Sequence, residues 1–143
     1  MTDYGGKSVQ DARQEQLRYT GLYQYRRLLD INDDQMNYIA EHDVDVVLPC
    51  PTMCEPDIFE HHERYVKTSD WDAMVQALEE LHPEYMKTYH RIFKGNYMYN
   101  YNILLAKKEV LRDYCAWLFP ILERTEELSD PKAGNEQIVI LVI

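Results

Sequence analysis

Two adjacent arginines, Arg26 and Arg27, have the residue type and position that most directly suggest binding chemistry. They follow residues 19–25, an aromatic and β-branched run that predicts a strand. In α/β folds, ligands gather where strands end, and the planar guanidinium of arginine donates two hydrogen bonds at once to a phosphate. The pair is therefore predicted to bind a phosphorylated ligand at the end of a central strand. Salt bridges to nearby acidic residues are the alternative.

Carboxylates are concentrated in residues 31–65, where nine acidic side chains stand against Arg64 alone. A solvated acidic face is the usual meaning of such a run. Within it, Asp43 and Asp45 have the spacing of a pair that holds Mg²⁺ or Mn²⁺, which prefer carboxylate oxygens. This pair precedes its predicted strand rather than following it, which weighs against a metal site.

A second metal hypothesis involves Cys50, Cys54, His61 and His62. The cysteine spacing is permitted for zinc, but the adjacent histidines lack the usual separation, so loop cysteines and surface histidines are favoured. No Ser-His-Asp set, phosphate loop or glycine-rich dinucleotide signature is present in the sequence.

The elements that must position these residues alternate between strand and helix, which predicts an α/β fold. Residues 45–48, which include Val46, have the apolar character expected of a strand that is buried on both faces. Alternating residues predict one strand over 96–106, and Pro120 is expected to kink or interrupt the last helix. The expected helices cover residues 8–17, 33–40, 58–66, 69–81, 83–93 and 107–122, and a bare apolar run covers 137–143.

Composition excludes several classes of protein. The chain has 143 residues, 45% of them hydrophobic, and a net charge of -10. This acidic balance argues against nucleic-acid binding. No apolar run approaches the length of a membrane helix, and the polar start is not a signal peptide. Three cysteines favour a reducing, cytoplasmic location.

Several segments, in the same order along the chain, resemble a bacterial family that carries the label of a domain of unknown function. Residues 19–27 resemble its "G-L-x-H-Y-R-R" signature, and residues 43–51 resemble its "D-x-D-V-x-L-P-x-P" strand. Trp71, Pro83 and Tyr85 match "D-W... H-P-E-Y"; residues 102–109 and 113–119 are similar to "N-M-F-I-M-x-K-E" and "Y-C-x-W-L-F". That family is common in capsular and exopolysaccharide loci and is usually described as glycosyltransferases.

The resemblance also sets expectations about domain organisation. It covers residues 18–128 as an incomplete family domain, preceded by a weakly matched segment, 1–17, and followed by an atypical tail, 129–143. The family's first part of the nucleotide-sugar-binding sheet and its Gly-Tyr-x-Gly-Glu-like continuation are missing, so a fragment is expected, one that has lost activity if the missing parts are required. Gln24 stands where the family usually has histidine.

The resemblance implies a partial glycosyltransferase-A-like mixed sheet flanked by helices, and transfer of a sugar from a nucleotide donor to a glycan acceptor. The donor-binding residues that it implies are Gln24, Tyr25, Arg26, Arg27 and Asn102. No cofactor is certain; a divalent cation, Mn²⁺ or Mg²⁺, is the one considered, with Asp43 and Asp45 as its weak candidate ligands. The expected partners are the donor, the acceptor and, peripherally, a polysaccharide assembly complex. A non-catalytic carbohydrate-binding or protein-interaction remnant is the alternative.

Overall fold

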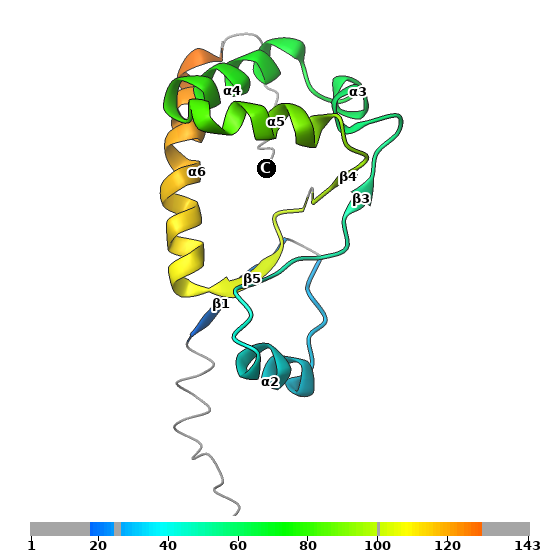
Figure 1. Cartoon of the computed structure of the whole chain (residues 1–143), viewed down its shortest axis with the longest axis vertical. Coiled ribbons are helices and arrows are strands. Elements are labelled where there is room, and N and C mark those ends of the chain that lie inside the picture. The colour runs from blue at the N-terminus through cyan, green and yellow to red at the C-terminus, as the bar shows by residue number, and fades with distance from the viewer. Residues whose placement is uncertain (1–17, 25–26, 100, 130–143) are drawn as a thin grey trace, which may run out of the picture. The chain divides into compact units, whose positions relative to one another are not determined.

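Two sheets, each with its own helices, are formed by the residues that the computed structural model describes, 18–24, 27–99 and 101–129 (Figure 1). They divide into two units. The first consists of residues up to Pro49 together with Tyr101–Asp113, and the second of Cys50–Asn100 together with the chain from Tyr114 on. The helix expected at 8–17 and the apolar run at 137–143 lie outside the described residues. The predicted boundaries after residues 17 and 128 stay a prediction.

The first unit contains a three-stranded antiparallel sheet in the order β1-β5-β2. Its strands are β1 (Tyr19–Leu22), β2 (Val46–Val47) and β5 (Leu104–Lys107). The predicted strand at 19–25 is confirmed over its first four residues, but its expected central place is wrong. Within the described sheet β5 is central, and β1 is an edge strand paired with β5 alone.

One face of this sheet is covered by α2 (Asp33–Glu41). The helix begins as the sequence predicts, because Asn32 and Gln35 form a reciprocal capping box. Ile39 of α2 packs with Tyr19 and Leu105, one residue from each of two paired strands. Residues of the opposite face are more open: Val46 and Leu22 are 38% and 41% exposed. The expectation that residues 45–48 are buried on both faces is therefore wrong.

Gly21 of β1 is a position of close approach. A Cβ atom placed there would lie 2.6 Å from a ring carbon of Tyr23, two residues along the same face. The aromatic ring lies back over the glycine, and the absence of a side chain at Gly21 leaves room for it.

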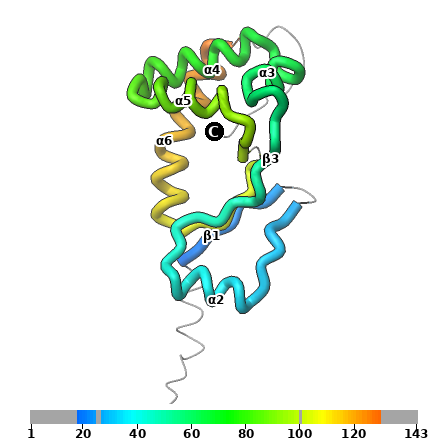
Figure 2. Tube along the Cα trace, turned by 45° about the vertical axis from the view of Figure 1, so that its right-hand side comes forward, coloured from blue at the N-terminus to red at the C-terminus, as the bar shows by residue number. Residues whose placement is uncertain are grey.

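The second unit has a short antiparallel pair, β3 (Thr52–Met53) with β4 (Tyr97–Met98), and a set of helices. The helical elements are α3 (Ile58–Glu63), α4 (Thr68–Leu81), a 3-10 turn η1 (Pro83–Tyr85), α5 (Met86–Phe93) and the later part of α6 (Lys108–Leu128). Helices α4 and α5 lie side by side (Figures 1 and 2). The core between them includes Ile58, Ala77 and Phe93, all almost fully buried.

Three local expectations in this part of the sequence need correction. Helix α4 begins at Thr68, one residue before the expected start at residue 69. The strand expected over 96–106 is two separate strands, β4 and β5, which belong to different sheets. Helix α6 continues through Pro120 without interruption. None of the helices in the described part of the chain has the length and apolar character needed to cross a membrane.

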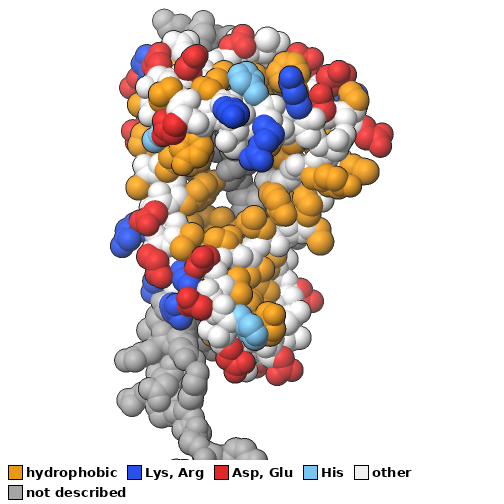
Figure 3. Space-filling view, in the orientation of Figure 1, with side chains coloured by type: hydrophobic (Ala, Val, Ile, Leu, Met, Phe, Trp, Pro, Cys, Tyr) orange, Lys and Arg blue, Asp and Glu red, His pale blue; other side chains and the backbone are white. Residues whose placement is uncertain are grey.

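The acidic side chains of residues 31–65 belong to both units. Of the nine in residues 31–65, all except Asp57 are exposed, and the segment divides between the two units at residue 50. Figure 3 shows acidic side chains interspersed with hydrophobic and basic ones on the visible surface. Solvation of these carboxylates is confirmed.

Candidate functional site

Arg27 lies over an aromatic ring beyond the end of β1. Its backbone N–H donates a 3.1 Å hydrogen bond to the carbonyl of Gln24, and its guanidinium carbon lies 4.5 Å from the centre of the Tyr101 ring. A cation placed over a tyrosine is attracted by the ring quadrupole. No carboxylate of the described residues pairs with Arg27, and its side chain is exposed. Stacking occupies the face of the guanidinium but leaves its in-plane N–H groups available to an anion.

The predicted donor-binding residues are partly brought together here. Gln24 is half-buried and bonded to Arg27 through the backbone, while Asn102 is exposed and adjacent to Tyr101 in the chain. Tyr25 and Arg26 lie outside the described residues. The salt-bridge alternative for Arg27 finds no support among the described carboxylates.

Tyr101 is a site residue that sequence reasoning missed. It belonged to the alternating tyrosine pattern of 96–106, which predicts only a strand face. Its pairing with Arg27 links positions 74 apart in sequence, and no local pattern contains that information. Its position immediately before Asn102 was the only available signal.

Asp43 and Asp45 meet a lysine. The ammonium of Lys107, at the end of β5, donates to Asp45 at 2.6 Å and lies 3.0 Å from an oxygen of Asp43. Arg18 also pairs with Asp43. The Lys107 side chain is only 7% exposed, whereas the two carboxylates are 64% and 70% exposed, so they cover the ammonium from the solvent side. A buried ammonium requires such partners.

The electrostatics of this cluster follow from these contacts. Hydrogen bonds to Asp45 and Asp43 raise the pKa of Lys107, and the hydrogen bond from Lys107 lowers the pKa of Asp43. Asp43 also has a positive φ of 53°, a conformation that Asp and Asn adopt more readily than most residues. The place that Mg²⁺ or Mn²⁺ would take between these carboxylates is filled by an ammonium.

Cys50, Cys54, His61 and His62 do not form a metal centre in this structure. Cys50 is exposed, whereas Cys54 is buried in the core, where burial raises the pKa of its thiol. Across residues 18–24, 27–99 and 101–129, no three His, Cys, Asp or Glu side chains come together in a way that could hold a metal ion.

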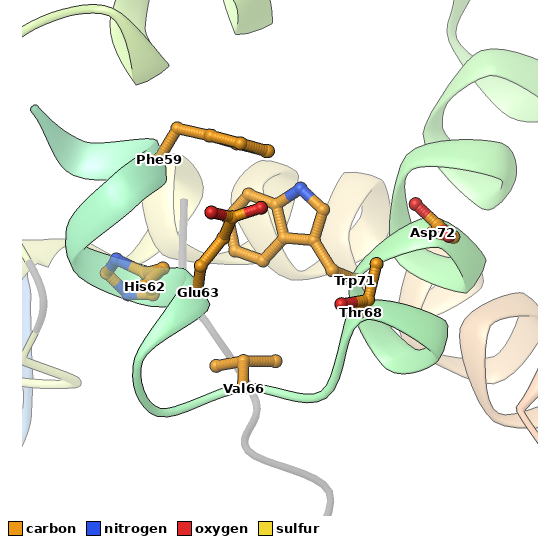
Figure 4. Close-up of a pocket in the computed structure, with 7 residues that line it drawn as sticks. All are labelled: Phe59, His62, Glu63, Val66, Thr68, Trp71 and Asp72. Carbon is orange, nitrogen blue, oxygen red and sulfur yellow. The ribbon is translucent and has the colours of Figure 1, made fainter.

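A small pocket lies between α3 and the first turns of α4 (Figure 4). Its volume is about 30 Å³, which admits a small polar group or one to two waters but not a sugar ring. Phe59 meets Trp71 edge-on at 6.2 Å, and burial lowers the pKa of His62. The residues around it are Phe59, His62, Glu63, Val66, Thr68, Trp71 and Asp72.

The indole of Trp71 is held in this pocket wall by its N–H, which donates to the Tyr89 hydroxyl at 2.8 Å. Replacing Tyr89 with Phe removes the acceptor and leaves a buried donor unsatisfied. We expect Tyr89→Phe to lower the free energy of unfolding by about 1–3 kcal/mol. Denaturant unfolding would measure it, with Tyr97→Phe, an exposed tyrosine of the same unit, as the control. Equal stability of the two variants would contradict the importance of this bond.

Comparison with known proteins gives the context for this geometry. No curated protein matches the chain. Among solved structures, the apo structure of WbbM, a bifunctional glycosyltransferase, is similar with a TM-score of 0.65 and 24% sequence identity. The match covers 75% of this chain but only 19% of that one, so the chain spans about a fifth of the length of WbbM. It confirms the predicted class, a mixed α/β fold with a small sheet flanked by helices, similar to part of a glycosyltransferase.

A family model matches most of the chain, residues 12–138. This range includes most of both units and every candidate residue described above. The chain therefore belongs to the family described as a domain of unknown function, DUF4422.

Proposed function

We propose that this chain is part of a glycosyltransferase that moves a sugar from a nucleotide donor to a growing capsular or extracellular polysaccharide. The likeness to part of WbbM supports the fold, and Arg27 supports the chemistry. Arg27 is the observation on which the proposal depends: an exposed guanidinium over Tyr101, without a carboxylate partner among the described residues.

Sugar transfer places specific demands on such a residue. The bond from the anomeric carbon to the donor diphosphate breaks as a bond to the acceptor hydroxyl oxygen forms and the hydroxyl proton passes to a base, so negative charge grows on the diphosphate. A preorganised cation offsets that charge. In this proposal Arg27 and Arg26 bind the diphosphate, and Gln24, Tyr25 and Asn102 shape the donor site around it.

The pairing of both carboxylates with a lysine favours a transfer reaction in which arginine, rather than a metal ion, offsets the charge on the diphosphate. Asp43 and Asp45 already neutralise Lys107, so binding Mn²⁺ or Mg²⁺ there would require displacing an ammonium. The proposal places the chain in the cytoplasm, where nucleotide sugars are made, beside a polysaccharide assembly complex.

Replacing Arg27 with Ala should weaken donor binding by roughly ten- to hundredfold, since a hydrogen bond between charged groups contributes about 1.5–3 kcal/mol. Calorimetric titration of the purified chain with UDP, GDP, TDP and their common sugar derivatives, with and without Mn²⁺, would measure this. Arg27→Lys should recover only part of the affinity, because an ammonium lacks the planar fork.

Arg112→Ala is the matched control. Arg112 belongs to the same unit, is exposed, and pairs among the described residues only with its neighbour Asp113. Its loss should change affinity by no more than about twofold. Donor binding that Arg27→Ala leaves unchanged would refute the assigned role. Binding of glycans but of no nucleotide would instead support the non-catalytic carbohydrate-binding alternative.

A further inference from the structure

Two buried hydrogen-bond donors on α6 have no partner among the residues that the structure describes. The hydroxyl of Tyr114 and the indole N–H of Trp117 are shielded from solvent, and no described residue bonds to either. They lie three residues apart on one helix face, with their rings stacked at 6.2 Å and 30°. An unsatisfied buried donor is destabilising, and native proteins contain few of them. Two on one helix face indicate a partner that supplies oxygen acceptors.

The surroundings of these donors are aromatic and reach the surface. His82 and Tyr85, at the η1 turn, lie 5.8 Å and 5.5 Å from the Trp117 ring. Tyr85 is 44% exposed. Nδ1 of His82 lies 3.2 Å from a carboxylate oxygen of Glu84, which is itself exposed. We call these five residues, His82, Glu84, Tyr85, Tyr114 and Trp117, the aromatic cluster.

The chemistry of the aromatic cluster selects among ligands. An indole N–H can only donate, so the missing partner must offer lone pairs, which a cationic ligand does not. The Glu84 carboxylate opposes an anion, and hydrogen bonds from its own backbone N–H and from His82 lower its pKa and so keep it charged. A sugar ring meets all of these requirements: its C–H face packs on aromatic rings, and its hydroxyls both accept and donate.

We infer that the aromatic cluster is a carbohydrate-binding site that takes one pyranose unit of a glycan. A role for this site in binding the acceptor of a transfer reaction rests on the proposed function. Binding of a sugar at the site depends only on residues of the second unit. Tyr85, which is 44% exposed and packed on Trp117, lies at the solvent-facing edge of the aromatic cluster, where the sugar ring would stack on it.

The chain offers a direct test because it contains only two tryptophans. In the ¹⁵N-labelled chain, Trp117 reports the site, and Trp71, already bonded to Tyr89, is an internal reference. We would titrate with the methyl pyranosides of glucose, galactose and mannose up to roughly 100 mM, because single-sugar affinities are commonly millimolar. At least one should shift the Trp117 indole signal and leave that of Trp71 in place. Trp117→Phe assigns the two signals.

Variants then separate stacking from general effects. Tyr85→Ala should weaken binding of the sugar that shifts the Trp117 signal by about three- to tenfold, the range expected for losing one aromatic contact. Tyr65→Ala, which removes a 72% exposed tyrosine of the same unit, should leave affinity unchanged. No shift of Trp117 with any pyranoside, or an equal shift with glycerol, would overturn the inference. Because no nucleotide is present, this failure would leave the donor-binding proposal for Arg27 standing, and the reverse also holds.

Discussion

Phe93→Ala is expected to lower the free energy of unfolding of the second unit by about 3–5 kcal/mol. The Phe93 side chain is 4% exposed, and its ring meets Trp71 edge-on at 4.9 Å and Tyr89 at 4.5 Å. Truncation loses the burial of the ring and leaves a cavity that neighbours fixed by the Trp71–Tyr89 hydrogen bond cannot easily fill. A loss of this size is a large part of the 5–15 kcal/mol that typically stabilises a domain.

Tryptophan fluorescence during denaturant unfolding would measure this loss selectively, because Trp71 and Trp117 both belong to the second unit. Phe119→Ala is the matched control: it removes the same ring from a position in that unit that is 56% exposed. Its effect should stay within about 0.5 kcal/mol. Comparable losses in the two variants would show that Phe93 is not in the core.

The combined change Asp43→Asn and Asp45→Asn should destabilise the first unit more than Lys107→Met does. The double variant leaves a buried ammonium without carboxylates, whereas Lys107→Met removes the charge itself and leaves two hydrated carboxylates. Asparagine is the suitable replacement at 43 because it tolerates the positive φ.

Hydrogen exchange at two backbone amides would report this difference, since the Lys107 N–H bonds to Asp45 and the Lys108 N–H to Arg18. Exchange in the double variant should be faster than in Lys107→Met by on the order of tenfold or more. Lys108→Met, at the exposed neighbouring position, should resemble the unaltered chain. A larger effect of Lys107→Met would contradict this account.

The pKa shifts in the same cluster predict the pH range over which its ion pairs stabilise the unaltered chain. The lowered pKa of Asp43 means that its contribution is present above its unfolded pKa, roughly 3.9, and is lost as the pH falls through the folded value. The raised pKa of Lys107 means that its contribution is present below roughly 10.4 and is lost as the pH rises through the folded value. The protection of the Lys107 and Lys108 amides from hydrogen exchange should therefore be constant between about pH 5 and 9.

Features encoded within one turn or one helix were the ones predictable from the sequence. The helices expected over residues 33–40 and 69–81 are local patterns, and the structure confirms both with a shift of one residue at one end. Residues 96–106 were misread because alternation reports only which side chains share a face. It does not show that Tyr97 and Leu105 have strand partners in different sheets.

The candidate sites depend on contacts that no local pattern contains. Asp45 and Lys107 are 62 residues apart, and Tyr85 and Trp117 come from segments that the sequence shows only as separate motifs. Residue type singled out Arg27, and its assignment to a donor site stays a prediction, whereas its ring partner Tyr101 was not predicted. The type of each residue predicted what chemistry it could do, whereas tertiary packing determined which residues lie together in a site.

The position of β5 at the centre of its sheet has a consequence for folding during synthesis. The edge strands β1 and β2 leave the ribosome first and have no strand partner until residues 104–107 follow. Contacts over such separations form slowly, because a long loop must close before any pairing compensates for it. Helices α4 and α5, in contrast, have packing partners among their near neighbours in sequence, such as Trp71 with Phe93. We therefore expect the nascent chain to order the helices of its middle segment while its first strand still waits for a partner.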